Sequence, residues 1–520
     1  MRRLSLALWI FVLGGLLAWP ALGRPGGGSV FRSHSSSRSS SLSSSRSTGS
    51  SSSQSSYRSS SSSRWPSSRS RPSSFTHPTS TVTDSDDARG IGPRFGFLIV
   101  IGLIAAFFLI PTGLSMSGAA RKPKGWSTQG ARSAPVVAES GRTRLDRLRS
   151  IDPDFSVILF EDFVYALYTE VHSARGTGRL ETLSPFLSAA TRQQLEQLGA
   201  ASVTTVVVGA MTYHSVDISP AVGARVVLQL EANYTEGTQS YWTLEHWEVA
   251  RGPGARSRPP ERTRVFACPS CGAPLERVVG GTCQYCRQVV NTGAFDWIVN
   301  SVRIVTREPR PPMLTGNGEE TGTNLPTRFD MGLAQSVAAL RQRDPQFDPQ
   351  ALNSRVGLIF STMQHAWSTL EWHLARPYLS DNLWTAQTYW IQAYRSSGLR
   401  NVNENARVVA LELVRITSDK WYDAATLRVH AAGLDYTIRD SDQAVVGGSR
   451  KHERSYTEYW TLIRGSGTKG PARTDLVCPS CGAPLSINAA GHCDYCQVKV
   501  TSGQFDWVLS RIEQDESYVA

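Results

Sequence analysis

The eight cysteines of this 520-residue chain fall into two groups with the same spacing. Each group has two Cys-x-x-Cys pairs separated by eleven residues, and each begins with the octapeptide CPSCGAPL. Two thiolate pairs on tight turns can hold one metal ion in a tetrahedral shell, and four thiolates are typical of structural zinc. The spacing therefore predicts two Zn²⁺ sites, one formed by Cys268, Cys271, Cys283 and Cys286, the other by Cys478, Cys481, Cys493 and Cys496.

A shell of four thiolates leaves no open coordination position, so we expect the ions to stabilise the fold rather than to catalyse a reaction. Rubredoxin-like iron and a thiol redox pair are the alternatives that the spacing leaves open. Gly272 and Gly482 follow the second cysteine of each group, where a glycine adopts the required backbone conformation at low cost. Thiolate ligands also require a reducing compartment, because an oxidising one favours disulfides.

The cysteine groups are part of a longer internal repeat. Four landmarks occur twice in the same order, which indicates a tandem duplication. The matched pairs are Asp152–Phe155 with Asp344–Phe347, Pro185–Ser188 with Pro377–Ser380, Tyr241–Leu244 with Tyr459–Leu462, and Phe295–Trp297 with Phe505–Trp507. In both copies the cysteine group lies between the last two landmarks, so we expect it to be a decorated hairpin loop.

The elements that carry these loops follow from hydrophobic periodicity. Apolar residues recur at helical spacing in 160–171 and 356–367, and shorter amphipathic helices are expected at 190–198 and 382–394. Strands are expected at 203–210, 226–234, 241–249 and 295–305, and again at 408–416, 427–431, 456–464 and 505–512. Helices followed by strands predict an α+β fold of two tandem domains, each with helices packed on a curved antiparallel sheet and a zinc ribbon between the last two strands.

The N-terminal part of the chain has the composition of a membrane anchor. Residues 1–23 read as a signal peptide or signal anchor, and the Ser/Arg-rich residues 24–93 are expected to be disordered. The uncharged run at 94–114 is long enough for a transmembrane helix. Eight Lys or Arg residues lie between Arg121 and Ser150, and this bias predicts that the following domains face the cytosol, with the Ser-rich segment outside.

The expected boundaries divide the rest of the chain into two domains and their connections. They are a basic juxtamembrane linker at 115–141, a first domain at 142–306 with its ribbon at 265–291, a linker at 307–328, a second domain at 329–513 with its ribbon at 475–501, and a tail at 514–520.

The order of motifs in the second copy, from Asp-Pro-x-Phe through Pro-Tyr-Leu-Ser to Tyr-Trp-Thr-Leu-Ile-Arg, resembles the Tim-forty-four-like (Tim44-like) domain family. The resemblance extends to the first copy, which departs from it at Glu245, where the second copy has Ile463. That family includes the tether of the mitochondrial presequence translocase and bacterial membrane-anchored proteins. The resemblance implies a cone-shaped fold with an apolar groove, and membrane-associated scaffolds that bind anionic lipid or protein without catalysing a reaction. It also implies a bacterial-type inner membrane as the location.

Two sets of residues are candidates for binding. Six aromatic residues of the second copy could line the groove, with ordinary core packing as the alternative: Trp367, Trp390, Tyr394, Trp421, Trp460 and Trp507. Arg121, Lys122 and Lys124 could contact anionic lipid, since basic residues beside a span are attracted to such a surface.

These observations favour a non-enzymatic, membrane-anchored adaptor that binds a protein or lipid partner, in protein translocation or membrane-protein assembly. The net charge of +11 and the pI of 9.4 leave nucleic-acid binding as an alternative, although much of that charge lies in the Ser-rich and juxtamembrane segments. The chain contains no nucleophile elbow or metalloprotease motif, and no small-molecule substrate is evident. An enzyme that uses a cone-shaped pocket is the weaker alternative.

Overall fold

The computed structural model describes residues 140–520, apart from 200, 316–322, 516 and 520. The expected signal segment (1–23), Ser-rich segment (24–93) and transmembrane helix (94–114) lie outside the described residues, as does nearly all of the juxtamembrane linker (115–141). Among the described residues, no helix combines the length and apolarity needed to cross a bilayer. The described residues belong to one compact unit, which contains two modules of similar build.

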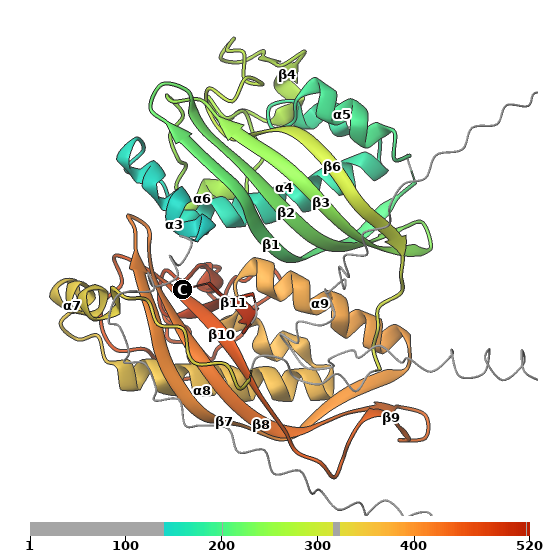
Figure 1. Ribbon diagram of the computed structural model, residues 1–520, viewed down its shortest axis with the longest axis vertical. Coiled ribbons are helices and arrows are strands. Elements are labelled where there is room, and N and C mark those ends of the chain that lie inside the picture. Colours follow the sequence, from blue (N-terminus) through green and yellow to red (C-terminus); the bar gives the residue numbers. More distant parts are fainter. Residues whose placement is uncertain (1–139, 200, 316–322, 516, 520) are drawn as a thin grey trace, which may run out of the picture. The chain divides into compact units, whose positions relative to one another are not determined.

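The first module places helices against a four-stranded antiparallel sheet (Figure 1). Its helices are α3 (Gly141–Asp146), α4 (Val157–Gly176) and α5 (Ala189–Glu196), with short 3₁₀ turns at Arg147–Ser150 and Leu180–Leu183. The strands β1 (Val203–Ser219), β2 (Gly223–Glu236), β3 (Gln239–Arg251) and β6 (Ile298–Pro309) lie side by side in that order.

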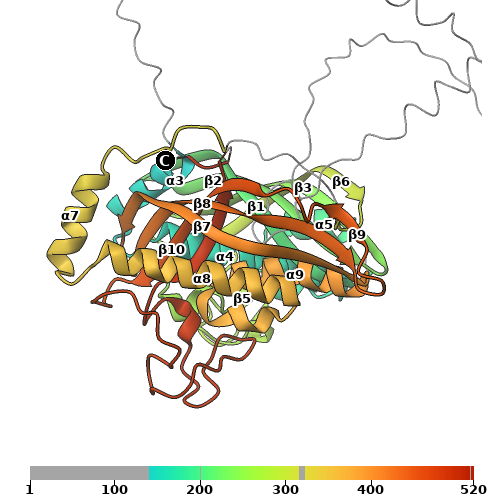
Figure 2. The same cartoon turned by 90° about the horizontal axis from the view of Figure 1, so that it is seen from below.

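The second module repeats this arrangement. Its helices are α7 (Leu333–Arg343), α8 (Pro349–Thr369) and α9 (Asp381–Ser396), with a 3₁₀ turn at Trp372–Tyr378. The strands β7 (Leu399–Ser418), β8 (Tyr422–Arg439), β10 (Arg454–Gly465) and β11 (Val508–Gln514) form the sheet in the order β11-β10-β8-β7, and the short β9 (Val445–Gly448) pairs with β8. Figure 2 shows α8 running along this sheet. The prediction of an α+β chain with antiparallel sheets is confirmed.

The Pro-(Phe/Tyr)-Leu-Ser landmark joins a helix to the last strand of each sheet. Leu187 forms a parallel bridge with Val299, and Leu379 forms the same bridge with Leu509. The serine that follows is the N-cap of the next helix: the Ser188 hydroxyl accepts a hydrogen bond from the Thr191 amide at 3.1 Å. Serine is favoured there because the first helical amides have no partner within the helix.

The Asp-Pro-x-Phe landmark supplies a buried carboxylate to an arginine at the end of a strand. Asp152 accepts a hydrogen bond from Arg251 at 2.7 Å, and Asp344 accepts one from Arg464 at 2.9 Å. All four side chains are at most 3% exposed. The same ion pair therefore fixes the start of the long helix to the third strand in both modules.

This ion pair corrects one of the landmark matches made from the sequence. Arg251 and Arg464 occupy the same place, so Trp247 corresponds to Trp460 and Glu245 to Glu458. The match of Tyr241–Leu244 with Tyr459–Leu462 was wrong by five residues, because four identical letters in a row carried more weight than the more widely spaced pattern Glu-x-Trp-x-x-x-Arg. The repeat itself does not depend on that match.

Candidate metal centres

Each cysteine group lies in the loop between the last two long strands of a sheet, β3 and β6 in the first module and β10 and β11 in the second. The first loop holds the short helix α6 (Pro260–Thr263), a 3₁₀ turn at Leu275–Arg277 and the small hairpin of β4 (Val278–Val279) and β5 (Thr282–Cys283). The second holds a 3₁₀ turn at Val500–Ser502. Within these loops, we call residues 265–291 the first ribbon and residues 475–501 the second ribbon.

The two cysteine pairs of each ribbon form turns with the same backbone bonds. In the first ribbon, the Gly272 amide donates to the Cys268 carbonyl at 2.8 Å, and the Arg287 amide donates to the Cys283 carbonyl at 2.8 Å. Gly272 has a φ of 80°, as predicted for the glycine after the cysteine pair. Arg287 has a φ of 60° in the same place after the second pair, so a non-glycine residue is held there in a left-handed conformation.

The second ribbon has matching bonds. The amides of Gly482 and Gln497 donate to the carbonyls of Cys478 and Cys493, at 2.9 Å each, and their φ values are 74° and 60°. Sequence inspection identified the two glycines but missed Arg287 and Gln497, because arginine and glutamine do not predict a left-handed backbone conformation. The signal that could have found them is their position, one residue after the last cysteine of each group.

The sulfur positions fit a single tetrahedral ion in each ribbon. The Sγ atoms of Cys268 and Cys286 are 3.9 Å apart, those of Cys271 and Cys283 are 3.8 Å apart, and those of Cys478 and Cys496 are 3.9 Å apart. Zinc–sulfur bonds of about 2.3 Å in a tetrahedron place sulfurs about 3.8 Å apart, whereas a disulfide joins them at about 2.05 Å. The two groups can therefore hold metal ions, and their geometry matches zinc better than it matches disulfides.

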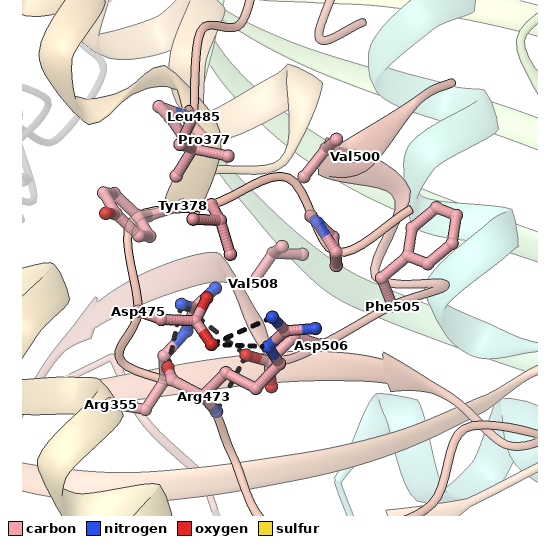
Figure 3. Close-up of a pocket in the computed structure, with 12 residues that line it drawn as sticks. Arg355, Pro377, Tyr378, Arg473, Asp475, Leu485, Val500, Phe505, Asp506 and Val508 are labelled. Atoms are coloured by element: carbon pink, nitrogen blue, oxygen red, sulfur yellow. Dashed lines mark hydrogen bonds and ion pairs between the residues drawn. The ribbon is translucent and has the colours of Figure 1, made fainter. Parts of the chain in front are cut away.

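Beside the second ribbon, the buried Arg355 links α8 to the segments that enter and leave the loop (Figure 3). The Arg355 side chain, from α8, donates to the backbone carbonyls of Trp507 at 3.1 Å and Arg473 at 3.0 Å, and it lies 3.5 Å from the Asp506 carboxylate. Figure 3 shows Arg355 and Arg473 near Asp506 and Asp475, and the space between them is only about 20 Å³. That is room for little more than one water molecule, so this place is a structural joint rather than a ligand pocket.

The first ribbon is joined to its module by a corresponding set of contacts with a different arginine. Arg258 pairs with Asp296 at 2.8 Å, and its guanidinium lies over the rings of Phe163 and Phe186. Arg355 lies in the same way over Tyr378, the partner of Phe186 in the repeat. In each module, therefore, the aspartate of the Phe-Asp-Trp landmark forms an ion pair with an arginine. Asp296 pairs with Arg258 from the loop, and Asp506 pairs with Arg355 from the long helix α8.

The six candidate groove residues do not all lie together. Five of them are buried in the apolar core of the second module, at 0–6% exposure: Trp367, Trp390, Tyr394, Trp460 and Trp507. Trp421 is only partly buried and packs against a separate small cluster, while its indole N–H donates to the Asp154 carbonyl at 2.8 Å. This packing favours the core interpretation for the five. The lipid-contact candidates Arg121, Lys122 and Lys124 lie outside the described residues.

Sequence inspection missed a buried carboxylate beside the repeated tryptophan of each sheet, Trp247 and Trp460. Glu245 accepts hydrogen bonds from Trp247 at 2.7 Å and Tyr168 at 3.0 Å, and His172 lies 3.6 Å away. Burial raises the pKa of Glu245, but His172 and the hydrogen bonds outweigh it and hold that pKa below the ordinary value. In the second module, the Glu458 carboxylate accepts the corresponding hydrogen bond from the Trp460 indole N–H at 2.9 Å. Glu245 and His172 are fully buried, so a substrate cannot reach them.

Comparison with known protein families gives one match. Residues 333–472 match the Tim44-like domain, a stretch that begins with α7 and ends before Cys478. The match therefore covers most of the second module and stops short of its ribbon. No curated protein matches the chain. Over residues 333–472, the second module is similar to the Tim44-like domain.

Proposed function

We propose that this protein is a membrane-anchored, non-enzymatic adaptor whose two modules bind a protein partner, an anionic lipid surface or both. The observation that carries the proposal is the Tim44-like match at residues 333–472, because that family is associated with membranes and protein translocation. The four-thiolate groups and the fully buried Glu245 and His172 support a role without catalysis, since an ion bound by four thiolates has no open coordination position and a substrate cannot reach the buried pair.

The proposal extends to the first module and to both ribbons. The repeated Asp–Arg ion pair, the repeated sheet order and the repeated helix cap support a second, cone-shaped Tim44-like domain in the first module. We propose zinc in both ribbons, where it would stabilise about 25 residues that cannot form an adequate core of their own. The uncharged run at 94–114 would provide the anchor, with the modules in the cytosol of a bacterial-type cell and Arg121, Lys122 and Lys124 at the lipid surface.

Site-specific photocrosslinking of the full-length chain in its native membrane tests the proposal. The crosslinker would replace exposed residues on each module, Val222 in the first and Val409 in the second, which are 76% and 64% exposed. We expect light-dependent adducts with a defined protein or with lipid, and recovery of the chain in the membrane fraction after carbonate extraction. A chain that is extracted by carbonate and gives no adduct from either module would contradict the adaptor role.

A further inference from the structure

A large cavity is lined by residues of both modules. Its volume is about 580 Å³, within the range of sites that bind ligands. Residues of α4 and β1 line it from the first module, and residues of α9, β10 and β11 line it from the second. The apolar part of the wall includes Leu159, Val207 and Ile463.

One border of this cavity is the open edge of a sheet. β1 is the end strand of the first module's sheet, and among the described residues only β2 pairs with it. Residues Val206, Val207, Val208 and Gly209 of this strand line the cavity. Because glycine has no side chain, at least part of that border is backbone. An end strand presents N–H and C=O groups that can pair with an added strand.

The opposite end strand is less available. In β11, Leu509 already forms a bridge with Leu379, and the Ser380 amide donates to the Leu509 carbonyl at 2.9 Å. Among the described residues, the β1 segment that lines the cavity has backbone bonds only to β2, although Val207 itself is 3% exposed and packs against the second module. Thr205 precedes the lining residues with a φ of 54°, beside a break in the β1–β2 register. Asn405 repeats this feature in β7, so it belongs to the fold of both modules rather than to the cavity alone.

The charges along the wall favour a cationic rather than an anionic occupant. Four acidic residues line the cavity, against three Lys or Arg. Three of these acids already bind cations: Glu161 is 2.7 Å from Arg142, Asp162 is 3.0 Å from Arg264, and Asp381 is 2.6 Å from Lys499. The fourth, Glu261, is exposed and accepts a hydrogen bond from the uncharged side-chain amide of Gln504 at 3.0 Å. A Lys or Arg of a bound ligand would form an ion pair with the Glu261 carboxylate.

We propose that this cavity binds an extended peptide that pairs with the edge of β1, places apolar side chains against the wall and directs a Lys or Arg toward Glu261. The inference rests on the proposed adaptor function and specifies the kind of protein segment that the adaptor receives. A fatty acyl chain would match the apolar wall as well, but its anionic head group would meet an excess of acidic residues.

Fluorescence anisotropy with the full-length chain tests the site. The probe is a fluorescein-labelled octapeptide, TVKVTVKV, which is compared with an analogue carrying Glu in place of Lys and with an analogue whose amide nitrogens are all methylated. We expect the lysine peptide to bind and the methylated peptide to lose at least about tenfold in affinity, because it cannot donate to β1. Equal binding of the lysine and glutamate peptides would overturn the proposal.

Variants of the chain locate the binding. Glu261→Lys should weaken the lysine peptide roughly fivefold, whereas Glu276→Lys, on the first ribbon but outside the cavity lining, should leave it unchanged. Ala386→Trp, on α9, should fill the cavity and abolish binding, while Ala386→Ser should not. Binding that is insensitive to Ala386→Trp would overturn the proposal.

A second probe, fluorescent oleate, distinguishes a peptide site from a lipid site. Photocrosslinking of the Ala386→Trp variant distinguishes failure of the cavity site from failure of the adaptor function. Fluorescent oleate that binds in place of the peptide and is blocked by Ala386→Trp would overturn the proposal in favour of a lipid. If photocrosslinking from Val409 identifies a protein partner but the Ala386→Trp variant captures it equally well, the adaptor function stands and the cavity site is refuted.

Discussion

Replacement of Asp152 by asparagine removes the charge that balances a buried arginine. Asp152 is fully buried and accepts hydrogen bonds from Arg251 at 2.7 Å and from the Ser257 amide and hydroxyl at 2.9 and 2.7 Å. Arg251 lies over the rings of Phe155 and Trp297 and is only 4% exposed, so water cannot replace the lost partner. Removal of one partner from a buried ion pair costs about 3–5 kcal/mol. We expect the Asp152→Asn variant to lose that much free energy of unfolding.

Asp154 offers a matched control two residues away. Its carboxylate pairs with Lys420 at 2.6 Å, but the two side chains are 41% and 47% exposed. An exposed pair of this kind contributes at most about 1 kcal/mol. Thermal unfolding of the full-length chain should therefore show a fall of roughly 6–20 °C in the Tm of the affected transition for Asp152→Asn and little change for Asp154→Asn. Equal shifts for the two variants would refute the reasoning.

The pH dependence gives a second check of the same ion pair. Burial raises the pKa of Asp152, but hydrogen bonds from Ser257 and Arg251 outweigh it and hold that pKa below its ordinary value. A carboxyl group of this kind stabilises the fold above its unfolded pKa of about 3.9, and its contribution is lost as the pH falls through the folded pKa. The stability difference between the wild type and Asp152→Asn should be full at pH 7 and should narrow in acid. A difference that is unchanged well below pH 4 would contradict the assignment.

Two further substitutions test the metal centres and the helix caps. Cys481→Ser should lower the zinc content of the purified chain from two ions to one by elemental analysis, whereas Ser480→Ala, its exposed neighbour, should retain both; two ions in both variants would contradict the four-thiolate site. Ser188→Ala should lower the free energy of unfolding by about 0.5–2 kcal/mol in chemical denaturation, because the Thr191 amide loses its cap, and Ser188→Asp should restore most of the loss. An alanine variant as stable as the wild type would show that the cap contributes little.

Much of the fold could be predicted from local patterns. The α4 and α8 helices follow the 3.6-residue spacing of their apolar side chains, and strands β2 and β3 follow alternation, because one face of each is buried. Strand β8 is buried on both faces, which alternation did not predict. The two cysteine groups were evident for a similar reason. Four cysteines at fixed spacing carry their geometry within one short loop, so no distant contact is needed to bring the Sγ atoms to within 4.8 Å of one another.

The tertiary structure decided what depends on residues far apart in the chain. The pairing of Asp152 with Arg251 spans 99 residues, and only that contact showed that Trp247, and not Trp242, corresponds to Trp460. The aromatic residues of the second module could not be divided from sequence into core and surface, because helical spacing does not say which other element covers each face. Trp421 therefore looked like its neighbours in the sequence, although it packs elsewhere.

By itself, the sequence determined the internal repeat, the order of helices and strands and the two groups of four cysteines, since all of these depend on residue type and spacing within short segments. Only the tertiary structure decided which arginine forms an ion pair with Asp296 and which with Asp506. It also decided that β1 is an end strand of its sheet and that the two modules enclose a cavity beside it. Those features depend on the packing of surfaces against one another, and no local pattern in the chain encodes that packing by itself.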